Sequence, residues 1–158
     1  MKKTVFILLL AIILGACGLQ KERVNGAVDN ESIGKEPPVL LVRSNNSEVA
    51  AVLGEYSWSF DNGDGTATTV SVDSDIPPRI VRNQTTPFTT ELDTEIQLDF
   101  AEPPQEIKVH IWNNSQMERE VDVEGSTFNT DEKGYILYEI IATWDQGSVH
   151  YAVKLNVQ

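Results

Sequence analysis

Residues 147–157 read GSVHYAVKLNV, and this stretch decides the fold. Large apolar side chains occupy every second position in it: Val149, Tyr151, Val153, Leu155 and Val157. A period of two indicates a β-strand with one buried face and one face in water. Residues 135–144 are rich in aromatic and β-branched types, and Asp145-Gln146-Gly147 supplies turn residues between the two runs. The sequence therefore predicts a β-hairpin here.

The same alternation recurs upstream. Residues 96–100 and 107–112 each predict a half-buried strand, and shorter strands are predicted at 39–42, 49–53, 56–60, 66–72 and 121–123. Residues 47–54 have one turn of helix as an alternative. Three Pro-Pro pairs, at 37–38, 77–78 and 103–104, precede strand-like runs and mark the beginnings or edges of strands. Many short strands separated by turns favour an all-β, antiparallel sandwich.

The N-terminal residues have the layout of a secretory signal. Lys2 and Lys3 precede an almost unbroken apolar run at 5–14, which the small residues Gly15 and Ala16 follow. The run is well short of the ~20 residues that a membrane-spanning helix needs. We therefore expect residues 1–16 to be a cleaved signal peptide.

The end of this signal resembles the lipobox of bacterial lipoprotein precursors, in the residues Leu14-Gly15-Ala16-Cys17. The resemblance implies cleavage before Cys17 and a diacylglyceryl thioether on its sulfur, with fatty acyl chains such as palmitate. Cys17 is the only cysteine, so no disulfide can form within the chain. One acyl chain binds a membrane only marginally, whereas two or three retain a protein stably. The expected location is the extracytoplasmic face of the cell membrane.

Composition limits the partners of the mature chain. Residues 1–16 hold two of the twelve basic residues and no acidic one, so 10 basic and 24 acidic residues remain and the net charge is −14. Such a surface repels nucleic acid, and we expect no nucleic-acid partner. Residues 17–38 form the lipidated cysteine and a polar, flexible tether. Residues 39–158 are then one β-sandwich domain.

A second resemblance concerns the strand order. The strand at 96–100, the proline pair, the strand at 107–112 and the terminal hairpin resemble the latter part of bacterial immunoglobulin-like or fibronectin-type domains, over residues 82–158. The resemblance implies an immunoglobulin-like β-sandwich. The cysteine pair typical of those domains is absent, so the resemblance carries no functional residues across.

Residues 61–66, DNGDGT, are the best candidate for metal chemistry. Asp61 and Asp64 offer carboxylates on a glycine-bent loop, which suits Ca²⁺, although the spacing does not fit an EF-hand. Asp, Asn and Gly are also what a tight hairpin turn demands. We favour the plain turn and keep Ca²⁺ binding as the alternative; no other cofactor is expected.

Aromatic and histidine side chains are the remaining candidates. Tyr56, Trp58 and Phe60 share a strand face and could form an aromatic binding patch for glycan or peptide, but a core strand is the favoured interpretation. Trp112 lies opposite the apolar face of its strand, so its exposure would indicate a binding patch. His110 and His150 fall on the polar sides of their strands; if those strands are neighbours, the rings could approach a carboxylate and bind metal. We favour surface histidines, because zinc ligands at recognisable spacing are missing.

No catalytic motif is present. No serine lies in a nucleophile elbow, and no glycine-rich loop has the context of a phosphate site. The sequence predicts a non-catalytic binding or interaction module that engages an envelope protein, peptide or polymer. The alternatives are a small acidic-residue or metal-dependent envelope enzyme, and an envelope accessory protein without a discrete ligand.

Overall fold

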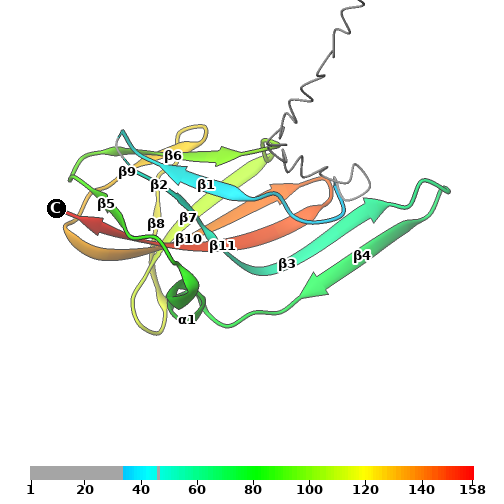
Figure 1. The fold of residues 1–158 in the computed structure, drawn as a ribbon, viewed down its shortest axis with the longest axis horizontal. Coiled ribbons are helices and arrows are strands. Elements are labelled where there is room, and N and C mark those ends of the chain that lie inside the picture. Colours follow the sequence, from blue (N-terminus) through cyan, green and yellow to red (C-terminus); the bar gives the residue numbers. More distant parts are fainter. Residues whose placement is uncertain (1–33, 46) are drawn as a thin grey trace, which may run out of the picture.

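The computed structural model describes residues 34–45 and 47–158 and has two sheets packed face to face. The smaller sheet has the order β2 (Glu48–Ala50), β1 (Leu40–Arg43), β6 (Glu95–Phe100), β9 (Thr127–Asn129). The larger has the order β4 (Ala67–Val72), β3 (Val52–Asp61), β11 (Gly147–Val157), β10 (Gly134–Trp144), β7 (Glu106–Trp112), β8 (Met117–Val121) (Figure 1). A short strand, β5 (Phe88–Thr90), pairs in parallel with β11. The predicted all-β antiparallel sandwich is thus confirmed.

The hairpin of β10 and β11 is the centre of the larger sheet. Its register runs without a break from Gly134 opposite Val157 to Trp144 opposite Gly147. Only Asp145 and Gln146 separate the two strands, as the turn chemistry predicts. The alternate apolar residues of β11 are buried, which confirms the prediction from residues 147–157.

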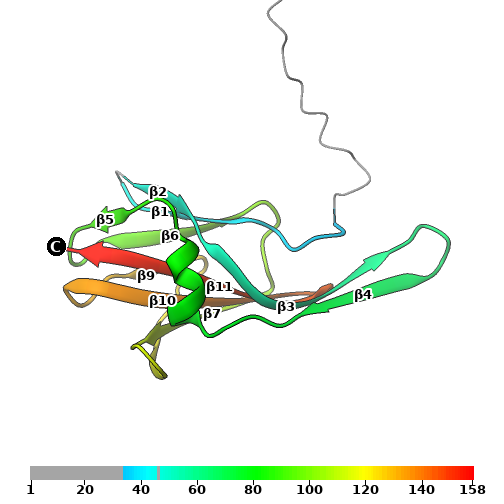
Figure 2. The same ribbon diagram turned by 60° about the horizontal axis from the view of Figure 1, so that its bottom comes forward.

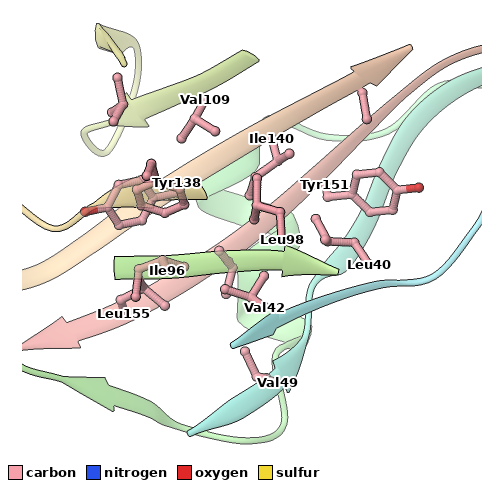
Figure 3. Packing of buried hydrophobic residues seen from close by; sticks show 14 of the residues in the cluster. Leu40, Val42, Val49, Ile96, Leu98, Val109, Tyr138, Ile140, Tyr151 and Leu155 are labelled. Carbon is pink, nitrogen blue, oxygen red and sulfur yellow. The ribbon is translucent and has the colours of Figure 1, made fainter. Parts of the chain in front are cut away.

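The core lies between the two sheets. Side chains from β1 and β6, including Leu40, Val42, Ile96 and Leu98, meet side chains of the larger sheet, among them Ile140 (Figure 3). Each of these five side chains is at most 2% exposed. Full burial of one aliphatic side chain contributes about 1.5–3 kcal/mol. Alternation along the strands therefore both defines the two sheets and holds them together.

Some sequence predictions were wrong or incomplete. The pair Pro77-Pro78 begins a helix, α1 (Pro77–Ile80), which continues into a 3₁₀ turn, η1 (Val81–Asn83). Proline fits the first turn of a helix, because the N–H that it lacks has no partner there. The helical turn considered for residues 47–54 is wrong, since β2 and the start of β3 occupy them. β5 and β9 were missed, and the strand expected at 121–123 is β8, slightly earlier in the chain.

The hairpin of β3 and β4 extends away from the sandwich (Figures 1 and 2). The first part of β3 pairs with β11, between Trp58 opposite Gly147 and Val52 opposite Ala152. β4 pairs with β3 alone, from Tyr56 opposite Val72 to the turn. The outermost strand of the larger sheet is therefore carried on a projecting hairpin.

Two buried tyrosines allow a matched test of the core. The hydroxyl of Tyr138 is buried and has no hydrogen-bond partner among the described residues, whereas that of Tyr151 donates to the carbonyl oxygen of Pro38 at 2.6 Å. We expect Tyr138→Phe to raise the free energy of unfolding by up to about 1–3 kcal/mol, and Tyr151→Phe to lower it by about 1 kcal/mol. Urea unfolding of both variants measures this. A comparable loss in both would mean that Tyr138 has a partner, such as a buried water.

Candidate functional site

A buried carboxylate lies on the face of the larger sheet that points away from the core. Glu139 of β10 is 6% exposed and lies opposite His110 of β7. The Oε1 atom of Glu139 accepts a hydrogen bond from Nδ1 of His150 at 2.9 Å. Its Oε2 accepts one from Nε1 of Trp112 at 2.7 Å and one from Nδ1 of His110 at 3.3 Å. Three side chains from two neighbouring strands thus converge on one carboxylate.

Burial and hydrogen bonding shift the pKa values of Glu139 and His150 in opposite directions. Burial works to raise the pKa of Glu139, but the hydrogen bonds from His150, Trp112 and His110 together outweigh it, and the pKa lies below its usual value. The hydrogen bond to Glu139 raises the pKa of His150 despite the opposing effect of burial. Nε2 of His150 also lies 3.5 Å from Oε1 of Glu55 on β3. The geometry favours an ionised Glu139 beside a protonated His150.

A small cavity adjoins the cluster where α1 crosses the sheet. Residues before and within α1, with Glu55, Trp112, Glu139 and His150, enclose about 150 Å³. At about 30 Å³ per water, this volume holds about five water molecules. Organic ligands need pockets of about 300–1,000 Å³. Asp75, a further carboxylate at its rim, is held by Nη1 of Arg79 at 2.9 Å. The cavity suits ordered water better than a substrate.

We expect the contribution of this cluster to stability to depend on pH. Because the pKa of His150 is higher in the folded chain than its unfolded value of about 6.5, protonation of His150 stabilises the fold. This stabilisation is complete below about pH 6.5 and is lost as pH rises through the folded pKa. Because the pKa of Glu139 is lowered in the folded chain, its ionised form stabilises the fold above about pH 4.5, and this stabilisation is lost as pH falls through the folded pKa. The two windows overlap at about pH 5–6. There, His150→Gln should cost about 1.5–3 kcal/mol, against about 1 kcal/mol at pH 9.

The measurement is chemical unfolding at both pH values. Lys154→Gln is the matched control, because it removes a charge from an exposed residue of the same strand that does not contact Glu139. Its effect should be similar at the two pH values. An equal cost of His150→Gln at pH 5.5 and pH 9 would show that the charge of His150 does not stabilise the fold.

The histidine prediction is therefore corrected. His110 and His150 are not surface histidines: their side chains are 14% and 27% exposed and approach a carboxylate, as the alternative anticipated. Among the described residues, no group of three or more His, Cys, Asp or Glu side chains has an arrangement that could hold a metal ion.

The aromatic candidates are divided between the core and the cluster. Trp58 is 1% exposed, donates Nε1 to the carbonyl oxygen of Gly34 at 2.9 Å and packs edge-on against Trp144, so it contributes no exposed surface. Tyr56 is half-buried and packs against the core. Trp112 is half-buried against the side chains of Leu137 and Ala152 and those of the α1–η1 segment. These three residues do not form one patch.

Asp61 and Asp64 lie in the turn between β3 and β4. Their side chains accept hydrogen bonds from the turn itself: Asp61 from the N–H of Gly63 at 2.7 Å, and Asp64 from the N–H and hydroxyl of Thr66 at 2.9 and 2.6 Å. These bonds lower the pKa of Asp64. Gly63 has a φ of 80°, a left-handed conformation that glycine adopts without cost. The two carboxylates thus have the contacts of a tight turn.

The strand edges of the larger sheet differ in character. β8, at one edge, carries Glu118, Arg119 and Glu120, and charged side chains are a common protection of edge strands. β4, at the other edge, reads ATTVSV; all six residues are exposed and none is charged. Its outer side is not paired with any strand in the part of the chain that the structure describes. β4 is therefore the one unprotected long edge within residues 34–45 and 47–158, because β2 and β9 have three residues each.

Sequence reasoning missed Glu139 and the edge position of β4. A signal for Glu139 was present, since it is the only charged residue in the otherwise apolar run of residues 135–142. A lone carboxylate in such a run requires buried partners. The composition of β4 was visible too, but its place in the sheet depends on strand order.

Comparisons of the chain with protein-family models, curated proteins and solved structures give no match. The helices of the described residues are too short, and not apolar enough, for any of them to cross a membrane.

Proposed function

We propose that this protein is a lipid-anchored, extracytoplasmic and non-catalytic binding module, which takes up an extended segment of an envelope protein or peptide along β4. The observation that carries the proposal is the uncharged, exposed and unpaired edge of β4. Every second residue of an antiparallel edge strand directs its N–H and C=O groups away from its partner. An incoming strand satisfies those groups, and the backbone hydrogen bonds supply affinity.

The position of β4 supports this role. The hairpin extends away from the sandwich, so a further strand can lie beside β4 without contacting the smaller sheet (Figure 2). The opposite edge, β8, carries three charged residues in succession. An edge that serves no contact is a liability for aggregation, and proteins normally protect such edges. The contrast between the two edges favours a binding role for the edge of β4.

The membrane anchor in the proposal rests on Leu14-Gly15-Ala16-Cys17, which lie outside the described residues. A tether of about 20 residues has an average reach of a few tens of ångströms, so the domain can meet partners beyond the lipid headgroups. The high negative charge argues against nucleic acid as the partner.

Proline substitution in β4 tests the proposal. Of the neighbours Thr69 and Val70, one directs its N–H to the open side, and proline removes that donor. With the uncharged peptide QVTVTVQ as probe, we expect Thr69→Pro or Val70→Pro to weaken binding by about tenfold or more, which is the loss of one or two hydrogen bonds. The matched control is Glu120→Pro in β8, which should leave binding unchanged.

Binding is measured by titrating the peptide into the full-length chain in detergent. Circular dichroism separates a local effect from unfolding, because the proline at the outward-facing position leaves the pairing with β3 intact. Unchanged affinity in both β4 variants would contradict the proposal. So would an equal loss in the β8 variant, or no binding to the unsubstituted chain at millimolar peptide.

A further inference from the structure

We infer, resting on the proposed function, that the strand that adds to β4 alternates polar and apolar residues and carries a basic side chain near each end. The charges around the β3–β4 hairpin and the chemistry of its two faces fit a cationic extended segment better than a second copy of this chain.

All charged residues in the hairpin and in the chain segments that flank it are acidic. Residues 44–78 contain six acidic residues and no Lys, Arg or His. Two of the six have a basic partner: Glu48 pairs with Arg43 and Asp75 pairs with Arg79. Both arginines lie just outside residues 44–78. The other four of these six acidic residues have no Lys or Arg partner within salt-bridge distance among the described residues: Glu55, Asp61, Asp64 and Asp73. One cation, Lys35, lines a hollow beside the turn together with Asp61 and Asp145.

One face of the hairpin is a row of hydroxyl groups with carboxylates at both ends. Ser57 and Ser71 lie opposite each other with their Oγ atoms 3.3 Å apart, and the hydroxyls of Ser59 and Thr69 are 2.7 Å apart. The next pair towards the turn begins with Asp61, opposite Ala67. At the other end, Asp73 follows β4 and shares a hollow with Glu55 and His150.

The other face of β4 carries Thr68 and two valines. Val70 lies opposite Trp58, and Val72 lies opposite Tyr56. The two valines are 37% and 38% exposed. An added strand would cover them with its own side chains on this face, so alternate positions of the strand should be apolar, preferably β-branched.

Spacing sets where the basic residues belong. At about 3.4 Å per residue, the distance from residue 67 to residue 73 is about 20 Å. An added strand reaches both carboxylate ends when basic side chains on its hydroxyl-facing side are six positions apart. Opposite charges across strands stabilise pairing, whereas like charges oppose it. Two acidic hairpins of two copies would repel each other, which disfavours self-pairing.

Three peptides test the inference in the full-length chain in detergent: KVTVTVK, QVTVTVQ and EVTVTVE. They differ only at the two ends that should face the carboxylates. At about 20 mM salt, where screening is weak, we expect the lysine peptide to bind about tenfold or more tightly than the glutamine peptide, and the glutamate peptide to bind most weakly. At about 0.5 M salt the lysine advantage should largely disappear.

Two substitutions locate the effect. Asp73→Asn and Asp61→Asn keep a side-chain oxygen but remove the charge, and together they should abolish most of the lysine advantage without changing the affinity for QVTVTVQ. Asp122→Asn, at an exposed acid just after β8, is the matched control and should change neither.

The outcomes separate this inference from the proposed function. Equal affinity of the lysine and glutamine peptides, with both still sensitive to proline in β4, would overturn the basic-segment inference and leave strand addition standing. Peptide binding that is insensitive to proline in β4 would overturn strand addition itself. A concentration-dependent dimer that Thr69→Pro or Val70→Pro disrupts would identify a second copy as the occupant and also overturn the inference.

Discussion

Gly147→Ala should lower the free energy of unfolding by about 4 kcal/mol or more, which is exceptional for one methyl group. Gly147 begins β11 with a φ of 150° and lies opposite Trp58 of β3. A Cβ atom at this position would lie 1.9 Å from the carbonyl oxygen of Ser57 and 2.9 Å from its carbonyl carbon. Both atoms belong to the backbone, so relief requires β3 to move away from β11. Denaturant unfolding with far-ultraviolet circular dichroism measures the loss.

Gly63→Ala is the matched control for that prediction. Gly63 has a φ of 80°, but nothing lies within 4 Å of a Cβ atom built there. The left-handed conformation should cost about 1–2 kcal/mol. If the free energy of unfolding falls equally in the two variants, β3 lies farther from Gly147 than the structure has it. If it falls much more in Gly147→Ala, the close contact of β3 and β11 positions the hairpin that carries β4.

Cys17→Ala should release the protein from the membrane fraction almost completely, by at least tenfold. Cys17 is the sole thiol and the acylation site that the lipobox resemblance implies. Each buried CH₂ of an acyl chain contributes about 0.8 kcal/mol, so two or three chains dominate membrane retention. Cell fractionation with an antibody, together with incorporation of labelled palmitate, measures the effect.

The control for this prediction is Asn25→Ala, which lies in the expected tether and should change neither retention nor labelling. Retention of the Cys17→Ala protein in washed membranes would mean that another segment holds it there. Retention without palmitate labelling of the unsubstituted chain would contradict the lipid anchor.

The architecture was largely predictable because the buried faces follow a period of two. Residues 96–100, 107–112 and 147–157 each show it, and each forms a strand with its alternate residues in the core. The strands that were missed, β5 and β9, have three residues each, too few for a period to be recognised. α1 was missed because two prolines read equally well as the beginning of a strand.

The candidate site was less predictable because it depends on which strands are neighbours. Glu139 and His150 lie on the two strands of the predicted hairpin, but His110 is 29 residues before Glu139 and meets it only because β7 is the neighbour of β10. β4 reads as an ordinary strand, and its significance comes from its place at the end of the sheet order. Local sequence carries periodicity and turn chemistry, but it does not carry the order of strands in a sheet.

Amide hydrogen exchange across residues 67–73 tests the central claim most directly. The full-length chain in detergent is compared with and without saturating KVTVTVK, with β8 as the internal reference. Strand addition predicts that alternate amides of β4 exchange at least about tenfold more slowly with the peptide, because their N–H groups then donate to it, and that the amides of β8 are unaffected. Unchanged exchange in β4, or protection that falls on β8, would contradict the account.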